Sequence, residues 1–160
     1  MSVKVIYGST TGTTESVAQQ IAAALGTEAI NVANASAADF AADLLVLGSS
    51  TWGYGELQDD WAANISLLEN ADLTGHKVAV FGMGDQSGFS DTYCDAMGII
   101  AEKAKASGAT LVGATSAAGY EHSASVADQG GTFCGLALDD TNQPDKTAER
   151  IAAWVAEIQK

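Results

Sequence analysis

Short continuous apolar runs alternate along the chain with stretches whose apolar residues recur every three or four positions. A continuous apolar run predicts a strand buried on both faces, as in a parallel sheet. The helical spacing predicts amphipathic helices, each with one apolar stripe facing the sheet. Predicted strands cover 3–7, 29–32, 44–48, 77–82 and 110–112, and predicted helices cover 17–26, 60–69, 94–106 and the chain from about 144 onward.

This alternation of strand and helix predicts one α/β domain over residues 1–160, a doubly wound five-stranded parallel sheet with helices on both faces. A polar, glycine-bearing segment from Gly119 to Gly135 interrupts the pattern just before the apolar run Leu136-Ala137-Leu138. We expect this segment to be an insertion that splits the last strand. Loops of this length inside a domain are usually functional or decorative.

Charge and cysteine content narrow the possible partners and compartment. Seven basic residues stand against 20 acidic ones, a net charge of −13, which would repel nucleic acid and anionic membranes. Cys94 and Cys134 match no metal or redox spacing, so we interpret them as packing residues. The chain shows no signal-peptide pattern and no apolar run near the ~20 residues of a membrane helix. We therefore expect a cytoplasmic protein that does not insert into membranes. We also expect it to be a monomer.

The loop Gly8-Ser9-Thr10-Thr11-Gly12-Thr13-Thr14 follows the first strand and begins the first helix. In open α/β sheets, ligands bind beyond the carboxyl ends of the strands. Five of the seven residues carry hydroxyls and none is basic. Hydroxyls and the free N–H groups of a helix start can hold a phosphate. The loop lacks the Lys-Ser/Thr pair of a Walker A motif. The alternative interpretation is a hydroxyl N-cap, which needs only one or two such residues.

Two further loops at strand ends place aromatic residues among glycines. The loop 48–56 carries Trp52 and Tyr54, and the loop 82–89 carries Phe89. Aromatic side chains in such loops favour stacking on a flat ligand. The alternative for Trp52 is burial in a small satellite core under its loop. A phosphate site facing two aromatic loops predicts a ligand with a phosphate group at one end and a planar ring system at the other. Flavin mononucleotide (FMN) is such a ligand.

Four motifs together make the sequence resemble the long-chain flavodoxins over essentially the whole chain. The motifs are Tyr7–Thr14, Thr51–Glu56, Gly82–Gln86, and Gly135–Asp139 with the insertion before it. The resemblance implies the flavodoxin-like fold and non-covalently bound FMN. It also implies a low-potential one-electron carrier that shuttles electrons between redox proteins without substrate turnover of its own.

The resemblance also implies roles for individual residues. The hydroxyl loop would cradle the phosphate, Trp52 would cover one ring face, and Phe89, where the family usually has Tyr, would cover the other. Backbone around Gly84 and Asp85 would bond the pyrimidine edge, and the Gly53-Tyr54 peptide would lie opposite flavin N5. The complete predicted set is Ser9, Thr10, Thr11, Gly12, Thr13, Thr14, Thr51, Trp52, Gly53, Tyr54, Gly55, Met83, Gly84, Asp85 and Phe89.

Acidic residues are concentrated in the segment that holds both aromatic loops. From Glu56 to Asp95 there are eight acids and one lysine, Lys77. Such a surface would steer the chain toward partners with basic surfaces. The resemblance implies partners such as ferredoxin–NADP reductase, photosystem I, nitrogenase or a radical-enzyme activase.

Two other functions are compatible with a fold of this class. A flavin-dependent NAD(P)H quinone or flavin reductase would need a substrate pocket over the flavin, and its mark would be NADPH oxidation without an added reductase. The sequence has no nucleophile–base pair or catalytic histidine motif for it, although flavin performs the chemistry itself. A phosphorylation-receiver domain would need acidic residues after the first and third strands. Gly8-Ser9 and Gly48-Ser49 stand there instead, which excludes it.

Overall fold

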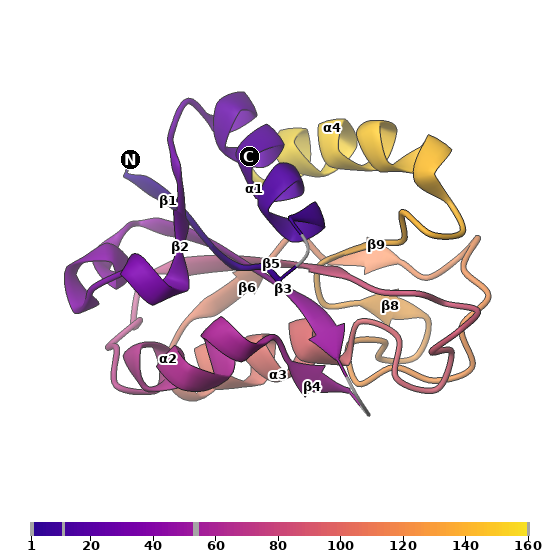
Figure 1. The fold of residues 1–160 in the computed structure, drawn as a ribbon. Coiled ribbons are helices and arrows are strands. Elements are labelled where there is room, and N and C mark those ends of the chain that lie inside the picture. Colours follow the sequence, from indigo (N-terminus) through magenta and orange to yellow (C-terminus); the bar gives the residue numbers. More distant parts are fainter. Residues whose placement is uncertain (1, 11, 53–54, 160) are drawn as a thin grey trace.

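A mostly parallel sheet lies between two layers of helices in the computed structural model, which describes residues 2–10, 12–52 and 55–159 (Figure 1). The strands are β1 (Val3–Gly8), β2 (Ala29–Asn31), β3 (Leu44–Trp52), β4 (Glu56–Leu57), β5 (Lys77–Met83), β6 (Thr110–Val112), β7 (Thr115–Ser116), β8 (Thr132–Phe133) and β9 (Leu136–Leu138). The α-helices are α1 (Thr13–Leu25), α2 (Asp59–Glu69), α3 (Asp95–Ala106) and α4 (Thr147–Ile158). Short 3-10 helices cover Val32–Asn34, Ala37–Ala41 and Pro144–Lys146.

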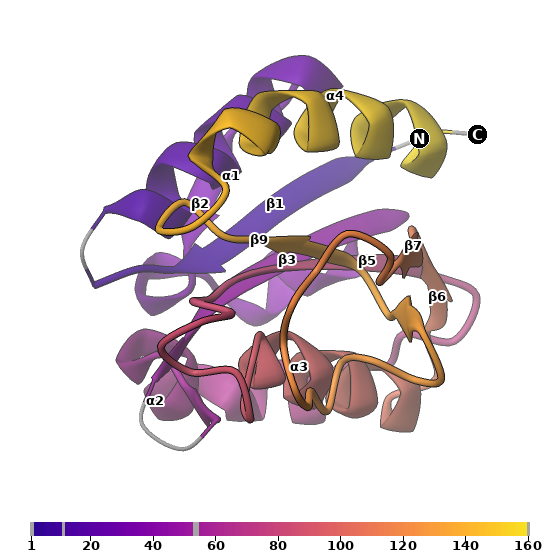
Figure 2. The same cartoon turned by 90° about the vertical axis from the view of Figure 1, so that its right-hand side faces the viewer.

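The sheet has the strand order β2-β1-β3-β5-β6, with every neighbouring pair parallel. Helices α1 and α4 cover one face, and α2 and α3 cover the other (Figures 1 and 2). The predicted doubly wound α/β fold is confirmed. None of the described helices is long and apolar enough to cross a membrane.

Continuous apolar strands are explained by a core on each side of the sheet. In β3, Leu44 and Val46 join the core under α1 and α4, whereas Leu45 and Leu47 join the core over α2 and α3. All four side chains are fully buried. Because successive side chains of a strand point to opposite faces, a strand covered on both sides needs an apolar residue at every position.

The last strand is split, as predicted. Residues 77–79 of β5 pair with β6, and residues 81–83 of the same strand pair with β9. The insertion between the two half-strands spans 113–135, so it begins six residues earlier than Gly119, the predicted start. The reason is that the chain turns at Gly113 (φ 84°) directly after β6, and β7 then pairs with β8 in a separate two-stranded sheet. In Figure 2 the insertion (orange) passes in front of α3.

The two cysteines are free thiols in packing positions, as expected. Cys94 is fully buried at the start of α3, and Cys134 is partly buried. Burial raises the pKa of the Cys134 thiol to about 11, so this thiol stays protonated at neutral pH.

Candidate functional site

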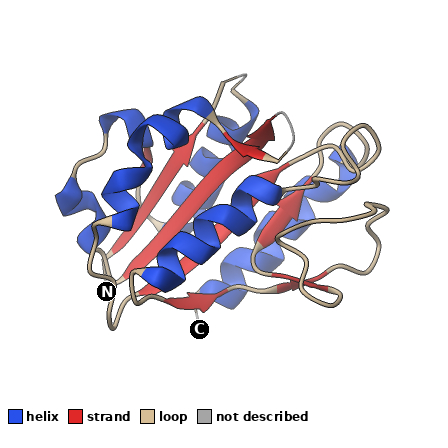
Figure 3. Ribbon diagram, turned by 90° about the horizontal axis from the view of Figure 1, so that it is seen from below, coloured by secondary structure: helices blue, strands red, loops and turns tan. Residues whose placement is uncertain are grey.

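A cavity of about 460 Å³ lies at the carboxyl ends of the central strands, where the loops gather beyond the arrowheads in Figure 3. Its volume falls in the range of roughly 300–1,000 Å³ typical of small-molecule sites. The lining residues are Thr13, Thr14, Ser50, Thr51, Met83, Gly84, Asp85, Phe89, Asp140 and Thr141. No lysine or arginine is found among the described residues of this lining, so an anionic group bound here would depend on neutral donors.

The start of α1 supplies such donors at one end of the cavity. The helix is preceded by Gly12 in the left-handed conformation (φ 90°), and no side chain caps it. Thus the first N–H groups of the helix have no side-chain acceptor among the described residues. Ser9 Oγ instead accepts from Gly12 N at 3.1 Å, and Thr10 Oγ1 accepts from Gln58 Nε2 at 3.0 Å. The N-cap residue is thus a glycine and not a hydroxyl residue, and a helix start without a side-chain cap among the described residues fits a phosphate.

The opposite end of the cavity is formed by the loop after β5. Phe89 is 58% exposed at the rim, one of two large hydrophobic side chains that are exposed in the described part of the chain. Gly84 passes closely over Tyr93, because a Cβ at this position would lie 2.9 Å from the ring. Its N–H donates to Leu138 O at 3.0 Å, so the loop is held against the end of β9. An exposed ring beside a close-packed backbone fits a flat ligand that needs both a stacking surface and backbone hydrogen bonds.

Asp85 shapes this loop from within. Its carboxylate accepts from Ser87 N at 3.0 Å, Gly88 N at 2.8 Å and Asn142 Nδ2 at 2.7 Å. The bond from Gly88 and the bond from Asn142 hold the pKa of Asp85 below its usual range. The side chain therefore stays ionised and fixes the turn that leads to Phe89.

Asp139, fully buried just after β9, joins two cavity loops. Its Oδ2 accepts from Gln86 N (3.0 Å), Gln86 Nε2 (2.8 Å) and Asn142 Nδ2 (2.8 Å). Its Oδ1 accepts from Thr141 N (3.0 Å) and Asn142 N (2.9 Å). Burial alone would raise the pKa of Asp139, but these donors hold it below the usual range. One buried anion thus positions the loop 84–89 and the loop 139–142 together.

The cavity brings together only part of the predicted site. Of the predicted residues, Thr13, Thr14, Thr51, Met83, Gly84, Asp85 and Phe89 line it. Three others, Ser9, Thr10 and Gly12, lie in the adjoining loop but do not line it, and Gly55 is buried against the side chain of Asp95. Predicted residues Thr11, Gly53 and Tyr54 lie outside the described residues, as does the side chain of Trp52, whose backbone ends β3.

Sequence reasoning missed Ser50, Asp140 and Thr141 as lining residues. The last two follow the half-strand β9, so they lie at a fourth strand end. The rule that ligands bind beyond carboxyl strand ends, applied also to the apolar run 136–138, would have indicated them.

Comparison with known proteins agrees with this geometry. The family profile described as Flavodoxin matches residues 5–154. A flavodoxin of Picosynechococcus sp. is 44% identical and covers 98% of this chain and 95% of its own. Flavodoxin 1 of Escherichia coli is 43% identical, with 96% and 90% covered. The crystal structure of Fusobacterium nucleatum flavodoxin bound to flavin mononucleotide superposes with a TM-score of 0.94 at 31% identity, covering 99% and 98% of the two chains.

The profile match and these identities over nearly the full length confirm the resemblance seen in the sequence motifs. The length of 160 residues and the split last strand agree with the long-chain type. The chain belongs to the flavodoxin family, FMN-dependent electron-transfer proteins that carry electrons between redox proteins and turn over no substrate of their own.

Proposed function

We propose that this chain holds FMN in the cavity with the phosphate at the start of α1 and the flavin ring at the loop 84–89. The observation that carries this orientation is the uncapped helix start, lined by Thr13 and Thr14, at one end of a cavity whose other end carries the exposed ring of Phe89. We name these two parts the phosphate end (9–14) and the ring end (84–89 with 139–142).

Bound FMN would supply the redox chemistry by taking up and releasing single electrons. At the phosphate end, the N–H groups of α1 and the hydroxyls of Ser9, Thr10, Thr11, Thr13 and Thr14 would hold the phosphate, with Gly12 allowing the backbone to close around it. A site without cations adds no long-range attraction for other anions. Recognition there would depend on hydrogen-bond geometry.

At the ring end, Phe89 would cover one face of the ring and Trp52 the other, while Gly84 and Asp85 would present backbone groups to the pyrimidine edge. The remaining predicted contacts, Thr51, Gly53, Tyr54, Gly55 and Met83, surround the ring in this proposal. Stacking between two aromatic side chains excludes water from the ring faces and leaves an edge for electron transfer to a partner.

Partners would be redox proteins with basic surfaces, of the ferredoxin–NADP reductase, photosystem I, nitrogenase or radical-enzyme activase type, met by a monomer in the cytoplasm. Support comes from four exposed acids: Asp140 lines the cavity, and Glu56, Asp59 and Asp91 lie close in sequence to the two aromatic loops. Like-charged acids at the rim favour encounter with a basic surface and repel acidic proteins. Reduction rates with such a partner should fall steeply as salt increases; rates independent of salt would contradict this docking mode.

The binding proposal is tested by visible absorption of the FMN-loaded protein during stepwise anaerobic reduction. We expect two resolved one-electron steps and no consumption of NADPH unless a reductase is added. Failure of the apo-protein to take up FMN would overturn the proposed site. A single two-electron step driven by NADPH alone would indicate a reductase instead.

A further inference from the structure

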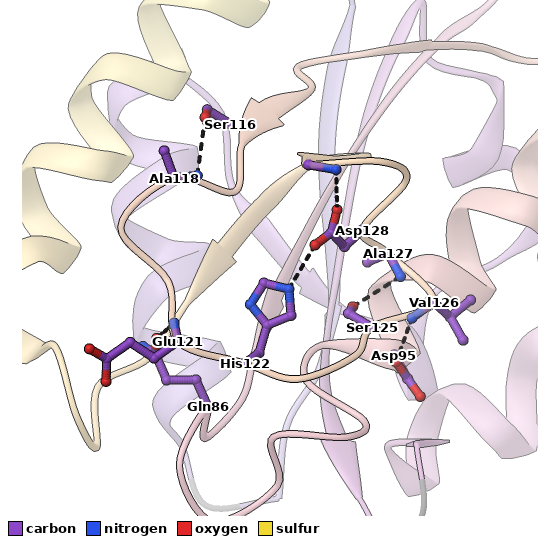
Figure 4. A network of polar contacts seen from close by, with 11 residues as sticks. Gln86, Asp95, Ser116, Ala118, Glu121, His122, Ser125, Val126, Ala127 and Asp128 are labelled. Carbon is purple, nitrogen blue, oxygen red and sulfur yellow. Dashed lines mark hydrogen bonds and ion pairs between the residues drawn. The ribbon is translucent and has the colours of Figure 1, made fainter.

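We call the loop 84–89 the ring loop. The insertion runs along residues 90–95, which follow this loop, and several hydrogen bonds join the two segments. The N–H groups of Ser123 and Ala124 donate to Ser90 O at 2.8 and 2.9 Å. Further along, Val126 N donates to Asp95 Oδ1 at 2.7 Å (Figure 4). The insertion is therefore a strap over residues 86–95, the stretch that carries Phe89 on its outer side.

Beneath this strap lies the side chain of Gln86, a residue that is 2% exposed. On one side Nε2 donates to Asp139 Oδ2 at 2.8 Å. On the other side Oε1 accepts from Glu121 N, in the insertion, at 2.6 Å (Figure 4). The amide thus connects the insertion, the ring loop and the loop after β9.

Only one orientation of this amide satisfies both neighbours. The Asp139 carboxylate can only accept, and the Glu121 N–H can only donate. A flipped amide would place its oxygen against the carboxylate and its NH2 group against the N–H. Neither a carboxylate nor an apolar side chain of similar size can serve both sides, so the bridge requires glutamine chemistry.

We propose that Gln86 is a positioning residue for flavin binding, through which the insertion fixes the ring end of the cavity. Gln86 does not line the cavity. It acts through the loop, because Phe89 follows three residues later and Gly84 and Asp85 immediately precede it. The inference rests on the proposed FMN site, since it states which part of the chain holds that site in its binding geometry.

The test is Gln86→Glu, followed by titration of the apo-protein with FMN and with riboflavin, which lacks the phosphate. At neutral pH the new carboxylate would face Asp139 and lose the donor, so both flavins should bind about tenfold more weakly, and by the same factor. When protonated, the glutamic acid can donate to Asp139 again. The deficit should therefore shrink as the pH falls from about 8 to about 5, where a buried carboxyl beside a carboxylate titrates.

Other titratable groups surround this amide, so every titration is compared with the wild-type protein at the same pH. They are Asp139, Asp85, Cys94 and Tyr93 on the side of the sheet and its loops, and Tyr120, Glu121 and His122 in the insertion. A matched control is Gln129→Glu, the same change at an exposed position of the insertion, for which we expect wild-type affinity at every pH.

Gln86→Asn keeps a neutral amide that is too short to span both partners. This variant should bind both flavins more weakly, and its affinity should not recover at low pH. It decides the question if circular dichroism shows that Gln86→Glu does not fold. Wild-type affinity in both folded variants, or a loss confined to FMN, would overturn the inference. Failure of the wild-type protein itself to bind FMN would instead overturn the proposed function.

Discussion

The phosphate end of the cavity is built from one contiguous segment, whereas the ring end joins two segments far apart in the sequence and is bonded to a third, the insertion. Ser9, Thr10 and Gly12 lead into α1 with Gly12 in the left-handed conformation, and one long-range side-chain bond, from Gln58 Nε2 to Thr10 Oγ1, holds them from outside. The ring end depends on Asp139, which binds Gln86 across 53 residues, and on Glu121, which binds Gln86 across 35. A buried carboxylate organises the second end.

Within a single site, the phosphate end therefore depends mainly on local structure, and the ring end depends on contacts between segments that are distant in the sequence. A local loop keeps its geometry as long as its own backbone conformation is allowed. An assembled loop keeps its geometry only while the rest of the fold holds, so changes at the ring end should affect stability and binding together. Changes at the phosphate end should affect binding alone.

The largest effect is expected from Asp139→Ala. The substitution leaves the donors of five hydrogen bonds without their acceptor, two of them on the buried residue Gln86. Removing such a group should lower the free energy of unfolding of the apo-protein by about 3 kcal/mol, measured by urea denaturation. Asp145→Ala, at an exposed acid of the 3-10 helix before α4, should cost almost nothing. Equal stability of the two variants would show that Asp139 does not organise the ring end.

A smaller and more selective effect is expected from Gly12→Ala. An alanine at φ 90° is strained, while nothing lies within 4 Å of the added methyl group. The strain of about 1–2 kcal/mol should be relieved by opening of the loop. This opening should lower the affinity for FMN about tenfold and leave the affinity for riboflavin, which lacks the phosphate, unchanged. Gly26, at the other end of α1 with φ 72°, offers a matched control. Gly26→Ala should lower stability without changing FMN affinity; a similar loss of affinity would argue against a localised phosphate end.

Phe89→Ala tests the ring end without disturbing the core. Because the side chain is 58% exposed, its removal should leave the urea midpoint of the apo-protein unchanged. Loss of one stacking surface should lower the affinities for FMN and for riboflavin alike, by about three- to tenfold. Val126→Ala removes the other exposed hydrophobic side chain and should have no effect on flavin titrations. An unchanged affinity after Phe89→Ala would mean that Phe89 does not cover the ring.

The smallest effect is a pH dependence of apo-protein stability that originates at the ring end. The pKa values of Asp85 and Asp139 are lowered from a usual value of 3.8, so their contribution is present above that pH. It is lost as the pH falls below 3.8 through the folded-state values, because folding then requires the release of protons. Urea denaturation at successive pH values should show this loss, and Asp139→Asn should remove part of it. An identical pH profile for the variant would contradict the assignment.

Much of the architecture could be predicted from the sequence because it is encoded locally. The run Leu44–Leu47 indicates a strand buried on both faces, and the hydroxyl loop indicates an anion site at a helix start. The roles of Asp139 and Gln86 could not be predicted, because an acid and an amide near a strand end usually face water. Their burial arises only when loops 53 residues apart meet. The early start of the insertion was hidden for a similar reason, since β7 is assigned to the insertion by its pairing with β8, 16 or more residues further along the chain.

The two half-strands have a consequence for how this protein can change. Val112 pairs with Ala79 and Leu136 with Phe81, so the chain leaves and rejoins the sheet at points two residues apart on β5, roughly 7 Å. A segment whose two ends lie this close together can be shortened, exchanged or replaced by a whole foreign domain without changing the order of the strands in the sheet. Lineages could therefore gain or lose it in one genetic event, and an engineer could graft a sensor there and read it out through the flavin.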